Sequence, residues 1–140
     1  MQTQGAMPEI RKTIVIQAPI EKVWQAVSTS EGIAGWWMPS TFKPIVGHEF
    51  ILHAGPYGDS PCKVTEIDPP NRVGFDWGKD WHLAFELRSL DGKTEFTLIH
   101  SGWDAGQVTE FGQPHSVVRG FMDGGWDRIV QEKLPSYLEA

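Results

Sequence analysis

The chain has 140 residues, the size of one domain, and its 12 basic and 18 acidic side chains leave a formal net charge of −6. That charge repels phosphate groups, so it argues against nucleic-acid binding. The single cysteine, Cys62, excludes a disulfide within the chain, and no apolar run is long enough to cross a membrane. We therefore expect a cytoplasmic protein with a disordered tail over residues 1–8 and one domain over residues 9–140.

One strand and two short helices are predicted first. Residues 9–17 alternate between apolar and polar side chains, as a half-buried strand does. Pro19 suits the first turn of a helix, and apolar residues recur behind it at helical spacing, which predicts a helix of about two turns. Ser30 is the expected N-cap of a second helix over residues 31–37. That helix should end before Pro39, because the residue that precedes a proline disfavours the α conformation.

Further strands are predicted between Gly47 and Trp103, where turns rich in glycine, proline and aspartate separate runs of alternating residues. The runs cover residues 48–53, 62–67, 73–77, 81–88 and 94–101. One face of these runs is almost entirely apolar and consists of Phe50, Leu52, Val64, Phe75, Trp77, Trp81, Leu83, Phe85, Leu87, Phe96, Leu98 and His100. An apolar sheet face of this size has to be covered by another element.

A long amphipathic helix is predicted over residues 115–138, because apolar side chains recur there every three or four residues. Gly120, Gly124 and Gly125 lie inside it and are expected to let the sheet or a ligand approach its backbone, and Pro135 is expected to kink its last turn. Only this helix is long enough to cover the sheet. The sequence therefore predicts an α+β fold in which a curved antiparallel sheet of six to seven strands grips the C-terminal helix.

Several stretches, in the same order as the predicted elements, resemble the START-like (SRPBCC) superfamily and, within it, the family homologous to the activator of heat shock protein 90 ATPase. They are Ala18-Pro19-Ile20-Glu21-Lys22-Val23-Trp24, Ser30-Glu31-Gly32-Ile33 with Trp36-Trp37, Val64-Thr65-Glu66-Ile67-Asp68-Pro69-Pro70, His100-Ser101-Gly102-Trp103, and Gly125-Trp126 with Tyr137-Leu138-Glu139. The resemblance implies the helix-grip fold with a cavity between sheet and C-terminal helix, which in relatives takes lipids, sterols, polyketides or flavonoid-like compounds. Members include passive binders, cyclases and co-chaperone-like modules, so activity has to be inferred from the site.

An aromatic cavity wall is the first candidate site. The expected ligand-binding residues are Trp36, Trp37, Phe50, Leu52, Phe75, Trp77, Phe85, Leu98, His100, Trp103, Val118, Met122 and Trp126. Such a lining suits a flat apolar ligand. The alternative is that these rings only fill the core, as aromatic stripes at regular spacing often do.

His100 is the polar residue of greatest interest, because it shares a strand face with Leu98 and should point inward. It could hydrogen-bond a ligand oxygen, or it could be a structural histidine bonded to the backbone. An enzyme would use His100 with Tyr57 or Glu66, although no pair of carboxylates is forced to converge. Residues 103–114 form either a lid beside the cavity mouth or an ordinary connector.

The leading hypothesis is a protein that binds a small hydrophobic or aromatic ligand, such as a lipid, a polyketide or a flavonoid, without a catalytic residue. The five histidines and Cys62 show no compact metal-ligand spacing, and phosphate loops and dinucleotide motifs do not occur, so we expect no metal and no cofactor. A chaperone-interacting module is the second hypothesis and a cyclase or hydrolase the third. The chain is expected to be a monomer or a weak homodimer.

Overall fold

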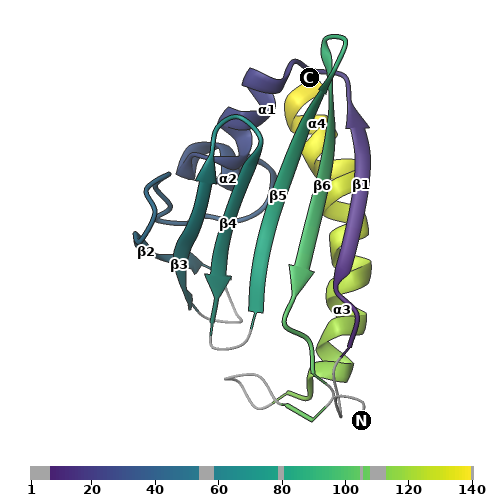
Figure 1. Ribbon diagram of the computed structural model, residues 1–140. Helices are drawn as coiled ribbons and strands as arrows, with labels where there is room; N and C mark the ends of the chain where they lie inside the picture. The colour runs from purple at the N-terminus through teal and green to yellow at the C-terminus, as the bar shows by residue number, and fades with distance from the viewer. Residues whose placement is uncertain (1–6, 54–58, 79–80, 105, 108–112, 140) are drawn as a thin grey trace, which may run out of the picture.

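The computed structural model describes residues 7–53, 59–78, 81–104, 106–107 and 113–139 (Figure 1). Six strands form one antiparallel sheet in the order β1-β6-β5-β4-β3-β2. The strands are β1 (Ile10–Ile16), β2 (Glu49–His53), β3 (Asp59–Asp68), β4 (Arg72–Trp77), β5 (Trp81–Leu90) and β6 (Lys93–Ser101). Consecutive strands from β2 to β6 are neighbours, and β1 closes the order beside β6. The predicted antiparallel meander is therefore confirmed.

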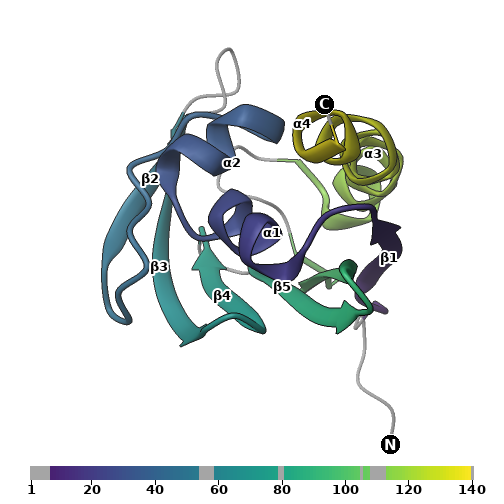
Figure 2. The ribbon, with the colours of Figure 1, turned by 90° about the horizontal axis from the view of Figure 1, so that it is seen from above.

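The helices lie on the concave side of this sheet. They are α1 (Ile20–Val27), α2 (Ser30–Trp36), α3 (His115–Arg128), the π-helical turn η2 (Ile129–Lys133) and α4 (Leu134–Glu139). The last three follow one another without a break and form the long C-terminal helix. Seen from above, the sheet curves around the helices, with the C-terminal helix on the β1 side and α1 and α2 beside it (Figure 2). This is the predicted helix-grip fold, which buries the apolar sheet face as expected.

The second short helix begins one residue earlier than predicted, because Thr29 and not Ser30 is its N-cap. The backbone of Thr29 is extended, with φ −135° and ψ 152°, and its hydroxyl oxygen accepts a hydrogen bond of 2.9 Å from the backbone N–H of Gly32. This bond satisfies one of the N–H groups that a helix start leaves free. The sequence offered two adjacent hydroxyl residues, and only the backbone conformation selects between them.

A partly solvated ion pair at the edge of the sheet attaches the C-terminal helix to strand β1. Lys12 of β1 reaches Asp123 at 2.8 Å and Asp127 at 2.9 Å, one helical turn apart on α3. Burial lowers the pKa of Lys12, but the two carboxylates outweigh it and raise the pKa above its usual value. Of all the strands, β1 is the one that the backbone of the C-terminal helix mainly approaches. The helix is thus held at one edge of the sheet.

Contrary to the prediction from the sequence, the glycines of α3 do not let the sheet approach the backbone of the helix. A Cβ at Gly120, Gly124 or Gly125 would meet no described atom within 4 Å, so the sheet does not approach them. The close approach lies elsewhere, at Gly32 of α2, where a Cβ would lie 2.6 Å from the Cα of Ala26. Glycine at position 32 is what lets α2 pack directly on the end of α1.

The helix irregularity expected at Pro135 occurs just before it. The backbone N–H of Leu134 bonds to the carbonyl of Ile129, five residues earlier, and closes the π-helical turn. A proline cannot donate a hydrogen bond to the preceding turn, and the π turn takes up this break within the helix.

Part of the predicted tail has fixed partners. The backbone N–H of Met7 donates to the carbonyl of Trp103 at 3.1 Å, and Arg119 Nε donates to the carbonyl of Pro8 at 3.0 Å. Met7 and Pro8 thus have hydrogen-bond partners in the domain, and residues 1–6 lie outside the described part of the chain. In that described part, no helix has the length and apolar character needed to cross a membrane.

We predict opposite effects on stability for alanine at two glycines. Gly32→Ala should lower the free energy of unfolding by about 2 kcal/mol, since its methyl group would overlap the backbone of α1. The matched control Gly124→Ala should raise it by about 0.5–1 kcal/mol, because a helical alanine there meets open space. Urea unfolding followed by circular dichroism measures both changes, and equal effects of the two substitutions would contradict the packing described here.

Candidate functional site

The predicted ligand-binding residues come together on the inner side of the sheet. Those from the strands, together with Trp36, Trp103 and Trp126, are buried. Trp37, Val118 and Met122 pack against the same core but stay partly exposed. The alternation of the strands and the helical spacing therefore identified one continuous region, with contributions from both sides of the grip.

Trp37 lies at the centre of the aromatic contacts in this region. Its ring centroid is 5.1 Å from Trp126 of α3, 5.4 Å from Trp77 of β4 and 6.4 Å from Phe85 of β5. Around Trp37 the rings thus touch across the interior, as the core-filling alternative expects. Phe50 packs with its neighbour Phe42, at 5.1 Å, in a side cluster under β2. Phe42 and its contact were not part of the predicted site.

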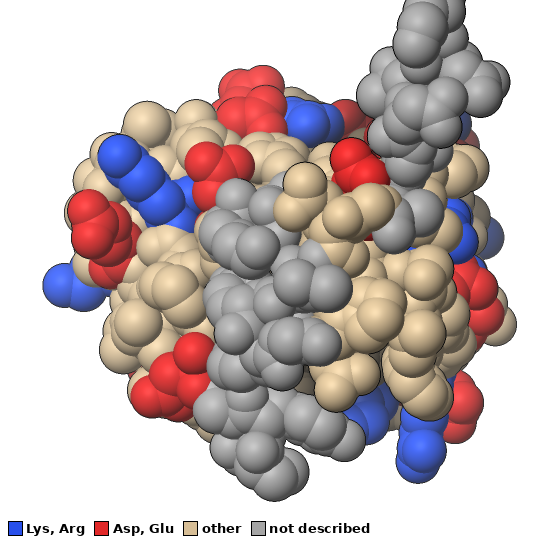
Figure 3. Space-filling view, turned by 90° about the horizontal axis from the view of Figure 1, so that it is seen from below, with Lys and Arg blue, Asp and Glu red and all other residues tan. Residues whose placement is uncertain are grey.

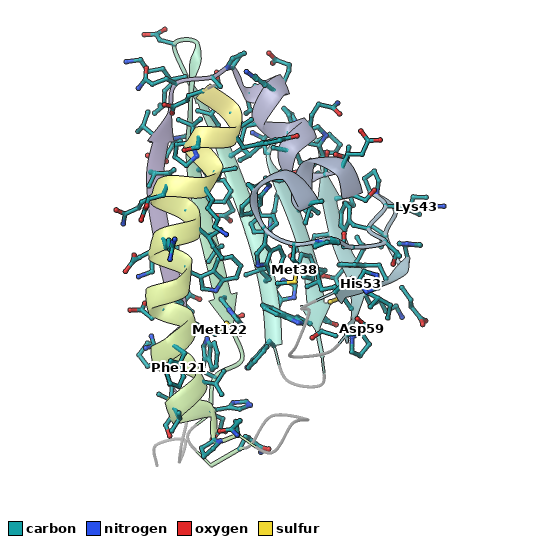
Figure 4. The ribbon with its side chains drawn as sticks, turned by 180° about the vertical axis from the view of Figure 1, so that it is seen from behind. Met38, Lys43, His53, Asp59, Phe121 and Met122 are labelled. Atoms are coloured by element: carbon teal, nitrogen blue, oxygen red, sulfur yellow. The ribbon has the colours of Figure 1, made fainter. Side chains whose placement is uncertain are left out.

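Several half-buried apolar side chains surround these buried rings. They are Trp37, Met38, Trp81, Val118 and Met122, which come from the α2 end, β5 and α3. Figure 4 shows Met38 and Met122 between the long helix and the sheet, with Phe121 on the neighbouring position of α3. Methionine side chains are flexible and polarisable, so they adapt to ligands of different shape. Met38 was not predicted as a site residue, although it follows the Trp36-Trp37 pair directly.

Four tryptophans enclose His100, and we call these five residues the His100 cluster. Ring centroids lie 4.6 Å from His100 for Trp103, 5.1 Å for Trp77 and Trp81, and 6.1 Å for Trp126. Trp126 Nε1 donates a hydrogen bond of 3.0 Å to His100 Nδ1, and Trp103 Nε1 donates one of 3.0 Å to the His100 carbonyl. The carbonyl of His100 accepts the indole N–H of Trp103, as the structural alternative expects. The imidazole of His100, in contrast, bonds to a side chain of the C-terminal helix.

The protonation state of His100 follows from these contacts. Because Nδ1 accepts from Trp126, the proton of the neutral ring is assigned to Nε2. Burial is the largest cause that lowers the pKa of His100 from 6.5 to about 3, and the charges of Arg119 and His115 add to it. The ring is therefore neutral at physiological pH.

Two polar atoms of the His100 cluster have no hydrogen-bond partner in the described part of the chain. They are His100 Nε2 and Trp81 Nε1, and both are buried. Trp81 was recognised from the sequence as part of the apolar sheet face but not as a binding residue. The signal that could have found it is its strand phase, shared with Leu83 and Phe85, next to a histidine on the paired strand.

A cleft of about 610 Å³ lies between α2 and the C-terminal helix. Its lining residues are Ala34, Gly35, Trp36, Trp37, Arg128, Glu132, Lys133, Ser136 and Tyr137. It reaches two of the predicted binding residues, Trp36 and Trp37. The sequence did not point to it, because its residues come from elements far apart in the chain.

The structure corrects one residue of the enzyme hypothesis. A β-bulge between Val64 and Glu66 moves Glu66 opposite Gly74, so Glu66 lies on the outer face of the sheet and not on the inner face with Val64. There its carboxylate binds Arg72 at 2.9 Å and His82 at 3.2 Å, and the bond to Arg72 holds its pKa below the usual value. Glu66 therefore cannot act with His100, and Tyr57 lies outside the described residues.

Two further expectations from the sequence concern metal ligands and the stretch 103–114. Among the residues that the structure describes, no three histidine, cysteine, aspartate or glutamate side chains gather to hold a metal ion. In the stretch 103–114, Trp103 is buried against His100, while residues 105 and 108–112 lie outside the described part. Trp103 is thus a wall residue of the His100 cluster, and the choice between lid and connector stays a prediction.

We predict that His100 makes stability depend on pH. The unfolded chain takes up its proton near pH 6.5 and the folded chain only near pH 3, so stability is full above 6.5, falls as the pH drops and levels off below 3. Between pH 7.5 and 5 this group should account for a loss of about 2 kcal/mol in the free energy of unfolding. In His100→Gln, which keeps an acceptor for Trp126, that share of the loss should vanish in urea titrations at the two pH values. An unchanged pH dependence would contradict a neutral buried imidazole.

Comparisons with known proteins agree with this architecture. The family model described as activator of Hsp90 ATPase homolog 1-like protein matches residues 17–139, whereas no curated protein matches. The solution structure of protein BH1534 from Bacillus halodurans is similar with a TM-score of 0.86 and 40% identity, over 96% of this chain and 99% of that one. Protein MLL2253 from Mesorhizobium loti has a TM-score of 0.81 and 23% identity, over 94% and 96%. The Aha1 dimer from Colwellia psychrerythraea has a TM-score of 0.76 and 23% identity, over 95% and 97%. The chain belongs to the family of activator of Hsp90 ATPase homolog 1-like proteins.

Proposed function

We propose that this protein binds a small hydrophobic or aromatic ligand, such as a lipid, a polyketide or a flavonoid-like compound, between the sheet and the C-terminal helix. The observation that carries the proposal is the set of half-buried apolar side chains around the inner aromatic surface: Trp37, Met38, Trp81, Val118 and Met122. They come from the α2 end, β5 and α3, and each keeps part of its surface exposed.

The attachment of the C-terminal helix supports this location. The helix backbone approaches the sheet mainly at β1, where Lys12 pairs with Asp123 and Asp127. Over the strands farther from β1, side chains such as Trp126 and Trp37 fill the distance between backbones. Side chains can change rotamer far more readily than a helix can move, so a ligand could enter among them without breaking the edge contacts.

Uncharged side chains reach the surface at the end of the molecule that is seen from below. In Figure 3 the described charged side chains lie mostly toward the rim, and described uncharged residues fill areas inside it. Covering such uncharged surface costs an apolar ligand little desolvation.

Probe binding tests the proposal with two neighbouring substitutions on α3. Fluorene added to the protein should change tryptophan fluorescence, and Met122→Gln should weaken its binding about tenfold by placing an amide against the probe. Phe121→Gln is the matched control, because Phe121 is 77% exposed and should leave the affinity nearly unchanged. Native mass spectrometry of the freshly purified protein asks whether an apolar molecule co-purifies. Failure of fluorene and of palmitic acid to bind, with no co-purified molecule, would reject the proposal.

A chaperone-interacting module is the second candidate function. The observation that favours it is an exposed apolar pair on α3, Val117 and Phe121, one helical turn apart and 47% and 77% exposed. If this pair contacts heat shock protein 90, Phe121→Gln should abolish the binding heat measured by calorimetry with the purified chaperone. Analytical ultracentrifugation of the free protein separates this outcome from self-association through the same pair. No heat with the unmodified protein would remove this candidate.

A further inference from the structure

The two unpartnered N–H groups of the His100 cluster restrict what the proposed ligand can be. His100 is fully buried, and the Nε1 atom of Trp81 is buried as well. A buried N–H without a partner costs as much as a lost hydrogen bond, so native proteins rarely keep one unless water or a ligand pairs with it. Here two such groups occur in rings whose centroids lie 5.1 Å apart.

Both groups can only donate. The indole N–H of Trp81 has no acceptor capacity, and His100 Nδ1 is already occupied by the 3.0 Å bond from Trp126. Because the low pKa of His100 keeps the ring neutral, its Nε2–H stays a neutral donor across the physiological range. A ligand group that only donates, such as an ammonium ion, would find no acceptor among these atoms.

The surroundings favour a neutral acceptor over an anionic one. Four indole rings form the walls around His100. The guanidinium of Arg119, whose charge acts on His100, donates to the backbone carbonyls of Pro8 and Glu9 instead. A carboxylate placed here would lose its hydration without gaining a free cation, whereas a ketone or quinone oxygen loses little on leaving water.

We infer that the ligand carries a carbonyl oxygen on a flat apolar skeleton, as an aromatic ketone or quinone does, and that this oxygen accepts the Nε2–H of His100 and the Nε1–H of Trp81. The inference rests on the proposed function and names its ligand class. Trp126 acts as a positioning residue, because its indole N–H fixes which nitrogen of His100 points to the ligand.

A matched pair of probes tests the inference. Fluoren-9-one and fluorene have the same skeleton and differ in the carbonyl oxygen, so their affinity ratio reports the hydrogen bonds and cancels most of the apolar contribution. We expect Trp81→Phe to lower the ketone-to-hydrocarbon affinity ratio about tenfold, the value of one to two hydrogen bonds. Trp81→Phe removes an N–H that has no partner and should fold normally. Trp24→Phe is the control, because Trp24 packs on the core from α1, outside the His100 cluster, and the ratio should stay unchanged.

A second measurement uses only the unmodified protein, so it does not depend on whether a variant folds. In ¹⁵N-labelled unmodified protein, fluoren-9-one should shift the indole N–H signal of Trp81 and the ring N–H of His100 downfield, and fluorene should not. If both probes bind with the same ratio in Trp81→Phe and neither signal shifts selectively with the ketone, the carbonyl inference is overturned while the proposed function stands. If neither probe binds, the inference is overturned, and the proposed function is rejected as well when palmitic acid also fails to bind and no apolar molecule co-purifies.

Discussion

The hydrogen bond from Trp126 to His100 joins the C-terminal helix to β6, and the chemistry of the interior depends on it. The bond pairs the indole N–H of Trp126 with Nδ1 of His100, so neither of these buried atoms is left without a hydrogen-bond partner. It also decides the tautomer of a histidine that has no charged partner in its ring contacts. With Nδ1 occupied, the two unpaired ring atoms of the His100 cluster are both N–H donors, which is why the inferred ligand has to bring an acceptor.

The two attachments of the helix are of different kinds and lie at different depths. At the edge, Lys12 holds two aspartates of α3 in a partly solvated ion pair. In the interior, Trp126 is buried among rings from α2 and the sheet. The ion pair gains strength only from its two-carboxylate geometry, since exposed pairs contribute little. The aromatic contact contributes through the apolar area that Trp126 buries and through its ring contacts.

Much of the fold could be predicted because the signals were local. Alternation gave the strands, and helical spacing gave the helices with ends within a few residues. The predictions that failed depended on single backbone events. The bulge after Val64 turned Glu66 outward, and the extended conformation of Thr29 took the cap from Ser30. Residue types alone do not predict where a bulge occurs or which of two adjacent hydroxyl residues becomes the N-cap.

The site was only partly predictable for a related reason. Strand phase placed His100 inside, but its partner Trp126 comes from a helix 26 residues later in the chain. The unpaired N–H of Trp81 is visible only when every neighbour is in place. Sequence reasoning can list which rings face inward, whereas which atoms remain unpaired is a property of the packed interior.

The π-helical turn Ile129–Lys133 has a geometric consequence for the C-terminal helix. Its core-facing residues Trp126, Val130, Leu134 and Leu138 are spaced by four. In a regular α-helix each such step overshoots a full turn by about 40°, so a stripe of this spacing would drift off the sheet. A π-helical turn contains more residues than an α-helical turn, so it reverses this drift. Both ends of the C-terminal helix therefore face the sheet. If the same residues formed a regular α-helix, the last two leucines would turn about 100° away from the sheet, whereas removing one residue from the π turn would restore a regular helix and leave them facing the sheet.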